Sequence, residues 1–422
     1  MALGAPRTLA GTFLTSIVIV GIVVAALGHP GHAFGEEGPA LDPEVVAKAV
    51  EEYLAARESK QSEWPWLKQL DLLHFFGDLR LRHESSVKRD GERDRHRERL
   101  RFRIGGNYQL LPDLQLGARL ITGSSGDPNS PHVTLGDGFD SLEISLDRAF
   151  ARYTPECLSG TWITAGKFGH AFKTNPVYGE LVWDADIQPE GAAGGYTWKG
   201  AGLLNRLDCT IGQYVLLEQS GASDASISVA QLALTAKPCD GATATAAVGY
   251  YHYSSVDPDG STAILADNQG NGTIDVDADG DADEYASRFG ILNVVASAST
   301  PIAATPVTWA GELIANTRAG DRKLGWALGC AVGSTAEPGD WKAYYQWQVI
   351  EQESVFSAFV HDDFLLATNF RGHVFGAQYR AVKHVTLHLW TSVVHREHRG
   401  TTLRTNSESG QWNLRFDVNI DF

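Results

Sequence analysis

An acidic segment carries the residues best suited to bind a metal ion. Residues 257–284 contain nine acidic residues and no basic one, which is more than half of the net charge of −16. Within this segment five aspartates occupy every second position: Asp275, Asp277, Asp279, Asp281 and Asp283. Their spacing matches positions 1, 3, 5, 7 and 9 of a calcium loop. Ala286 replaces the bidentate glutamate of an EF-hand, so an acidic loop exposed to solvent is the alternative.

Arginines form a second group, and they repeat with the two-residue period of a β-strand. In residues 99–104 they alternate with leucine, phenylalanine and isoleucine, so guanidinium groups and apolar side chains point to opposite faces. Two neighbouring predicted strands extend the basic face, which consists of Arg80, Arg82, Arg99, Arg101, Arg103 and Arg119. We predict that this face lines an aqueous interior, where it would act on passing ions and dipoles. The alternative is a charged face on a soluble sheet.

The segment 172–190 could supply the opposite charge. Beside Tyr178 and Trp183 it holds four acidic residues, Glu180, Asp184, Asp186 and Glu190. If the segment folds inward, these carboxylates face the arginines across a constriction, and the field between them orients dipolar solutes. The alternative is that the acids only solvate an external loop.

These side chains require a sheet with one face exposed to water and the other face shielded from it. Residues 411–422 alternate polar and apolar side chains without a break and end on the apolar face with Phe422. Comparable alternation recurs from His74 onward in about 16 segments, a number typical of mid-sized membrane barrels. The terminal aromatic residue is similar to the C-terminal signal that the barrel-assembly machinery reads in outer-membrane proteins.

The connections between the predicted strands fall into two alternating classes. Tight turns are expected at residues 111–113, 157–160, 199–202, 238–241 and 382–384. Between them lie long polar segments at residues 123–141, 172–188, 255–285 and 351–368. A barrel that spans a membrane has short turns on one side and long loops on the other. We therefore predict an all-β, antiparallel, up-and-down transmembrane β-barrel over residues 73–422.

The N-terminus has the features of an export signal followed by a short helix. Residues 13–27 form an apolar run behind Arg7, and small residues at 31–33 suit a cleavage site. The run is shorter than the roughly 20 residues of a spanning helix, although an uncleaved anchor is the alternative. We predict a signal peptide over residues 1–33 and a periplasmic helix with its linker over residues 34–72.

Several short motifs resemble those of the putative porin family of proteobacterial outer membranes. They are GDLRLR (77–82), RDRHRERLRFR (93–103), TGSSGDPNS (122–130), LGDGF (135–139), LDRAF (146–150) and VWD (182–184). The resemblance is specific over residues 77–190 and architectural beyond them. It implies a 16-stranded porin in the outer membrane of a Gram-negative bacterium, through which small polar solutes diffuse. The resemblance is compatible with a homotrimer and implies no catalytic residues.

Composition and motifs also bear on other classes of protein. The net charge of −16 argues against nucleic acid as a partner, because phosphates would be repelled. An enzymatic or adhesive barrel is one alternative, but no GxSxG elbow supports a serine hydrolase. A secreted carbohydrate-binding β protein is another, in line with 11 tryptophans. We expect outer-membrane lipid, the assembly machinery and small polar solutes as partners. No cofactor is required, and the acidic outer loop is a candidate site for calcium.

The acidic segment generates a direct test. We expect isothermal titration with calcium chloride to give binding heat in the millimolar range, because the alternating carboxylates supply several oxygen ligands. Replacing both Asp277 and Asp279 with asparagine should remove that heat. A native chain that gives no heat at millimolar calcium would leave only an acidic loop.

Overall fold

The computed structural model describes most of the chain from Leu72 onward. The described residues are 72–88, 93–123, 126, 129–179, 181–218, 220, 223–256, 268–276, 278, 282–361, 363–364, 367–398 and 410–422. The predicted signal peptide and the predicted helix of residues 34–71 lie outside them. The chain divides into two units, Met1–His74 and Phe75–Phe422, and the second contains the barrel. Within the described residues, no helix has the length and apolar character needed to cross a membrane.

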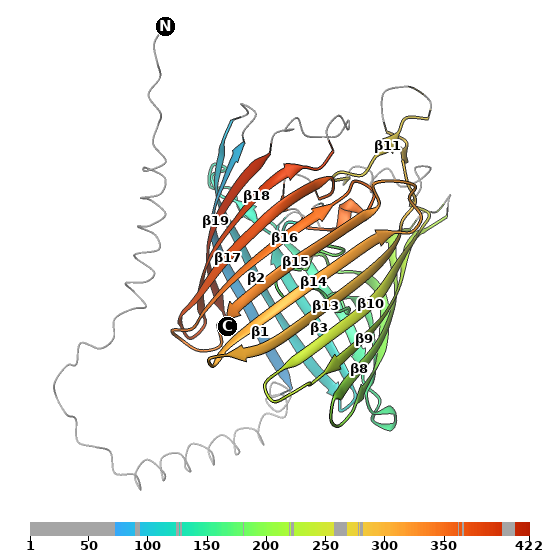
Figure 1. The fold of residues 1–422 in the computed structure, drawn as a ribbon, viewed down its shortest axis with the longest axis vertical. Helices are drawn as coiled ribbons and strands as arrows, with labels where there is room; N and C mark the ends of the chain where they lie inside the picture. Colours follow the sequence, from blue (N-terminus) through green and yellow to red (C-terminus); the bar gives the residue numbers. More distant parts are fainter. Residues whose placement is uncertain are drawn as a thin grey trace, which may run out of the picture. The chain divides into compact units, whose positions relative to one another are not determined.

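Long strands form the wall of the second unit (Figure 1). The first eight are β1 (Leu73–Lys88), β2 (Arg95–Leu111), β3 (Leu114–Thr122), β5 (Ile144–Tyr153), β6 (Thr161–Lys167), β7 (Glu190–Lys199), β8 (Leu204–Leu217) and β9 (Ala225–Ala236). The next eight are β10 (Thr243–Ser254), β13 (Gly290–Ile302), β14 (Thr305–Asn316), β15 (Leu324–Gly333), β16 (Trp341–Ile350), β17 (Phe370–Val382), β18 (Val385–Arg396) and β19 (Gln411–Asp421). The connections hold three short strands, β4 (Val133–Thr134), β11 (Thr273–Ile274) and β12 (Glu284–Tyr285), and the 3-10 turns Glu156–Leu158 and Ser357–Phe359.

The sheet closes on itself. Each long strand pairs with its neighbours in the chain, and the two-residue β4 joins the same 17-stranded sheet beside β2. The last strand, β19, pairs antiparallel with β1 in a register that runs from Asp78↔Asp421 to Lys88↔Gln411. Closure leaves no edge strand, so backbone N–H and C=O groups need no partner from lipid. The predicted up-and-down barrel of about 16 strands is confirmed.

Short and long connections alternate along the described chain, as the sequence predicted. Strands β17 and β18 are joined by two residues, 383–384, whereas residues 351–369 join β16 to β17. Because successive strands run in opposite directions, the long loops gather at one rim and the short turns at the other. Two long connections recur below: the third loop (168–189), between β6 and β7, and the β16–β17 loop (351–369).

Period-two alternation places the two faces of the wall. Exposed leucines and isoleucines cover the outside, among them Ile104, Leu120, Ile211, Leu232, Leu313 and Leu328. On β9, buried Val229 and Gln231 alternate with exposed Ala230 and Leu232. The outer residues form the apolar band that contacts lipid, and the buried residues point into the barrel.

The largest apolar core lies inside the barrel, where inward side chains meet the long loops. From the third loop it contains Phe172, Leu181 and Trp183, and from the β16–β17 loop it contains Phe356 and Val360. These pack with wall residues that include Tyr214 of β8, Ile227 of β9 and Tyr251 of β10. Burying these groups holds both loops in the lumen, and part of the interior is therefore apolar.

Phe422 secures the junction between the first and last strands. Its backbone N–H donates to the Gly77 carbonyl at 3.0 Å, and the Gly77 N–H donates to the Phe422 carbonyl at 2.9 Å. The Phe422 ring stacks on Phe102 with centroids 6.3 Å apart. A Cβ at residue 77 would lie only 2.5 Å from this ring, so glycine is needed there. The ring is still 56% exposed, which places it on the lipid side.

We predict that Phe422→Ala lowers the yield of folded barrel and its stability by about 1–2 kcal/mol, since the stacked ring is lost. Refolding into detergent, followed by the heat-dependent shift on SDS gels, measures the folded fraction. Phe422→Tyr should retain it, and so should Phe139→Ala, because Phe139 is fully exposed in a loop. Equal yields for native and Phe422→Ala chains would contradict the role of Phe422.

Candidate functional site

Five of the six predicted arginines gather at one cavity inside the barrel. Arg80 and Arg82 reach it from β1, and Arg99, Arg101 and Arg103 reach it from β2. The cavity, here called the arginine-wall cavity, has a volume of about 600 Å³. Arg119 on β3 points inward as well, but it pairs with Asp147 and is not part of the cavity lining.

Carboxylates on neighbouring strands and on two long loops balance the arginines. Asp78 accepts hydrogen bonds from Arg101 at 2.8 Å and from Arg103 at 2.6 Å. Asp417 of β19, only 1% exposed, accepts from Arg82 at 2.8 Å. Among the described lining residues six arginines meet six aspartates: Arg80, Arg82, Arg99, Arg101, Arg103 and Arg415, with Asp78, Asp184, Asp186, Asp363, Asp417 and Asp421. The wall is therefore strongly polar but carries little net charge over the described residues.

The third loop brings two of its predicted acids to this wall. One Asp186 oxygen lies 3.3 Å from Arg101 and 3.4 Å from Arg103. Asp184 also lines the cavity, and its carboxylate accepts the backbone N–H of Asp186 at 2.7 Å. Asp186 thus forms a direct ion pair, rather than facing the arginines across open water.

The other two predicted acids differ. Glu180 lies outside the described residues. Glu190 does not belong to the constriction: it begins β7, is 63% exposed, and pairs with Lys167 of β6 at 2.6 Å. Side chains alternate along β7, and Ala193 is buried inside the barrel. The inward position next to Glu190 is therefore Gly191, and Glu190 itself points outward.

Hydrogen bonds hold the third loop in the lumen. The amide of Gln231 on β9 contacts both backbone groups of Lys173, accepting its N–H at 2.7 Å and donating to its carbonyl at 3.0 Å. The Asp184 N–H donates to the Phe359 carbonyl at 2.8 Å and so joins the third loop to the β16–β17 loop. Asp363 of that loop binds both Tyr178 and Arg415.

Sequence reasoning missed several residues of the site. Asp78 and Glu84 share the strand parity of Arg80 and Arg82, so the two-residue period of β1 was a usable signal. Glu84 lies between two arginines, 3.5 Å from Arg99 and 3.0 Å from Arg415. Strand periodicity could not have identified Asp363, because this residue lies in a long loop and not in a strand.

The predicted calcium loop is only partly described. Asp277, Asp279 and Asp281 lie outside the described residues. In the β11–β12 hairpin, Asp275 directly follows β11 and Asp283 directly precedes β12. Their carboxylates accept the backbone N–H groups of Ala278 at 2.6 Å and of Val276 at 2.7 Å, respectively. Within the part of the chain that the structure describes, no cluster of three metal-ligating side chains is present. Calcium binding stays a prediction.

Several solved structures are similar to this one. The structure is similar to OprB of Pseudomonas putida, with 10% identity, a TM-score of 0.55, and coverage of 86% of this chain and 97% of that chain. OmpF of Salmonella typhi in complex with daunomycin gives 12% identity, a TM-score of 0.49, and coverage of 83% and 97%. An anion-selective porin from Comamonas acidovorans gives 11% identity, a TM-score of 0.46, and coverage of 83% of this chain and 97% of that chain.

Sequence comparison identifies the family. No curated protein sequence matches the chain. The model of the family described as putative porin matches residues 87–289, which confirms the resemblance and extends it past residue 190. These residues contain all of β2, the third loop and the strands up to β10. Residues 87–289 therefore belong to the putative porin family, and the closed barrel that they help to build is a porin channel of the outer membrane of a Gram-negative bacterium.

Proposed function

We propose that the barrel is a passive diffusion channel for small hydrophilic solutes and ions, and that the arginine-wall cavity with the third loop governs what passes. The observation that carries this proposal is the position of Asp186 against Arg101 and Arg103 inside the barrel. Fixed charges of both signs in a narrow aqueous space orient dipolar solutes and disfavour apolar ones. Small polar solutes are the proposed cargo, and a homotrimer is the proposed assembly.

An enzymatic role is the less favoured alternative. It would require an activated nucleophile beside His388 or His395 of β18, or beside His384 in the turn that precedes β18. His388 lies 3.0 Å from the Tyr344 hydroxyl and 3.7 Å from Asp417. His384 is exposed at a turn beside Asp421. These contacts extend the polar wall of the lumen, which supports a channel rather than a catalyst.

Conductance in a planar bilayer tests the proposal. The mature chain, refolded in detergent, should give step-like openings. We expect Asp184→Asn and Asp186→Asn to shift the reversal potential in a salt gradient toward anion selectivity, because each removes one carboxylate from a nearly balanced wall. Asparagine retains a side-chain oxygen, so the hydrogen bond from the Asp186 N–H to residue 184 can persist.

The control is Asp321→Asn, which removes an exposed carboxylate from the β14–β15 connection. Its reversal potential should equal that of the native channel. Native potentials in both third-loop variants would show that these carboxylates do not set selectivity. A folded barrel without any openings would contradict the channel itself.

Two buried histidines should make the packing of the third loop and the β16–β17 loop in the lumen depend on pH. His170 of the third loop stacks on Trp183 with ring centroids 5.1 Å apart, and burial lowers the pKa of His170 to about 3. His361 of the β16–β17 loop packs against Phe364 at 4.5 Å, and burial lowers the pKa of His361 to about 4. Both imidazoles are therefore neutral when the loops are packed in the lumen.

Acidification should loosen these loops. The pKa of each packed histidine lies below the value of about 6.5 for an exposed one, so the packed state is favoured above pH 6.5 and loses stability as the pH falls toward 4. At pH 5 the cost is at most about 2 kcal/mol for each histidine. We expect more frequent current fluctuations at pH 5 than at pH 7.5. The double variant His170→Gln with His361→Gln should reduce that difference.

His384→Gln serves as the matched control, because His384 is exposed at the β17–β18 turn. It should retain the full response to acid. The same pH dependence in the double variant and in the native channel would exclude these two histidines as its source.

A further inference from the structure

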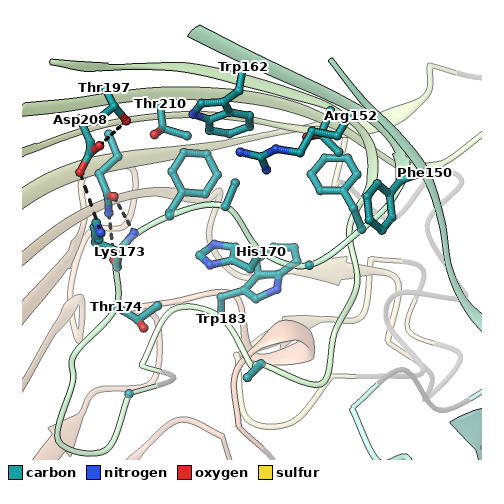
Figure 2. Close-up of a pocket in the computed structure, with 18 of the residues that line it drawn as sticks. Phe150, Arg152, Trp162, His170, Lys173, Thr174, Trp183, Thr197, Asp208 and Thr210 are labelled. Atoms are coloured by element: carbon teal, nitrogen blue, oxygen red, sulfur yellow. Dashed lines mark hydrogen bonds and ion pairs between the residues drawn. The ribbon is translucent and has the colours of Figure 1, made fainter. Parts of the chain in front are cut away.

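A second cavity lies beneath the third loop, away from the arginine wall (Figure 2). Its volume is about 700 Å³, and strands β5 to β9 form its wall. It extends from the third loop to Arg152, Trp162 and Thr197, which lie close to the short-turn ends of β5, β6 and β7. We call it the third-loop cavity.

Its charges are not balanced in the way that those of the arginine wall are. Among the described lining residues four cations, Arg148, Arg152, Lys173 and Arg206, accompany one carboxylate, Asp208. Asp208 lies 2.8 Å from Arg206 and 3.9 Å from Lys173, and it accepts a hydrogen bond from Thr197 at 2.7 Å. Asp208 is thus already engaged with two of the four cations. Of the two cavities, this one therefore has an excess of positive charge among its described lining residues.

Among the described residues, the two remaining guanidinium groups make their direct contacts with neutral side chains, although Asp147 and Asp186 also act on Arg148 electrostatically. Arg148 donates to the side-chain oxygen of Gln188 at 2.7 Å. The Arg152 guanidinium lies over the indole of Trp162, 4.8 Å from the ring centroid. In the described part of the chain, Arg152 has neither an ion pair nor a hydrogen bond to a carboxylate. A carboxylate that entered the cavity could accept two parallel N–H bonds from such a group.

Aromatic side chains surround these cations. Phe150 and Trp162 lie on the wall, and Phe168, Phe172 and Trp183 come from the third loop. Figure 2 shows Trp162 and Phe150 on the wall side and the stacked pair of His170 and Trp183 on the loop side, with Arg152 pointing into the space. Flat apolar groups pack well against such rings, and a concave site with a few placed polar groups is typical of small-molecule binding.

We propose that the third-loop cavity is a binding site for small aromatic carboxylates on their way through the channel. The carboxylate would bind Arg152 and Arg148, and the aromatic ring would lie against Trp162 and Phe168. Neither charge nor ring alone would suffice, since an inorganic anion leaves the aromatic surfaces uncovered and a neutral ring offers no carboxylate to the guanidinium groups. This inference rests on the proposed function, because it names the class of solute that such a channel would bind.

Blocking of the potassium chloride current tests it, with benzoate as the probe. Benzoate should reduce the single-channel current at millimolar concentration. Acetate, which lacks the ring, and benzamide, which lacks the charge, should each need at least tenfold higher concentrations for the same block. Calorimetric titration of the detergent-solubilised barrel with benzoate gives a second readout that does not depend on the route of the current.

Variants locate the site. Arg152→Gln and Trp162→Leu should each raise the half-blocking concentration of benzoate by about tenfold while open-channel steps persist. Arg380→Gln is the matched control, because Arg380 of β17 pairs with Asp421 at 2.9 Å and lines neither cavity. It should leave the block unchanged.

The possible outcomes separate the two proposals. A refolded barrel without openings would contradict the channel, whereas openings that benzoate and acetate block equally would overturn only the aromatic carboxylate site. Loss of benzoate binding in Arg101→Gln, with native binding in Arg152→Gln, would place the site at the arginine wall and overturn the inference. Heat-dependent migration on gels shows that each variant is folded.

Discussion

The pairing of the last strand with the first is the constraint on which the rest of the structure depends. Hydrocarbon offers no hydrogen bonds, so a sheet in a membrane must satisfy its backbone groups by closing. Here closure is made between β1 and β19, where Gly77 and Phe422 exchange both backbone hydrogen bonds. The same junction brings Asp417 and Arg415 of the last strand beside Arg82 and Glu84 of the first. The charged wall is therefore assembled only when the barrel closes.

The interior is divided by the third loop. On one side its Asp186 meets the arginine wall, where described carboxylates and guanidinium groups are equal in number. On the other side its Phe168 and Trp183 line a cavity in which described cations outnumber carboxylates. A wall with equal numbers of positive and negative groups orients dipoles and excludes neither cations nor anions. A cavity with an excess of cations and with aromatic surfaces favours anions that carry a ring. One loop thus contributes to two electrostatic environments.

The position of that loop depends on packing as much as on charge. Apolar side chains from the third loop and the β16–β17 loop share one core with inward residues of the wall. Two hydrogen bonds between Gln231 and the Lys173 backbone then fix the position of this lysine in the lumen. The loops therefore cover part of the lumen wall, and the arginines line one of the cavities that remain.

The sequence by itself determined the barrel and the parity of its side chains. Alternation with a period of two is a local property, so it placed Arg99, Arg101 and Arg103 on the inner face and Phe422 on the outer one. Turn residues and loop lengths likewise determined which connections share a rim. The family resemblance gave the same architecture from independent motifs.

Only the tertiary structure decided which charges meet. Arg82 and Asp417 are 335 residues apart, and their contact requires closure of the sheet. Asp186 and Glu190 are close in the sequence, yet one reaches the arginine wall and the other pairs outside with Lys167. The reason is physical: strand periodicity fixes the direction of a side chain relative to its own strand, whereas the path of a long loop depends on apolar burial and hydrogen bonds with distant strands. The third-loop cavity and its excess of cations follow from that path.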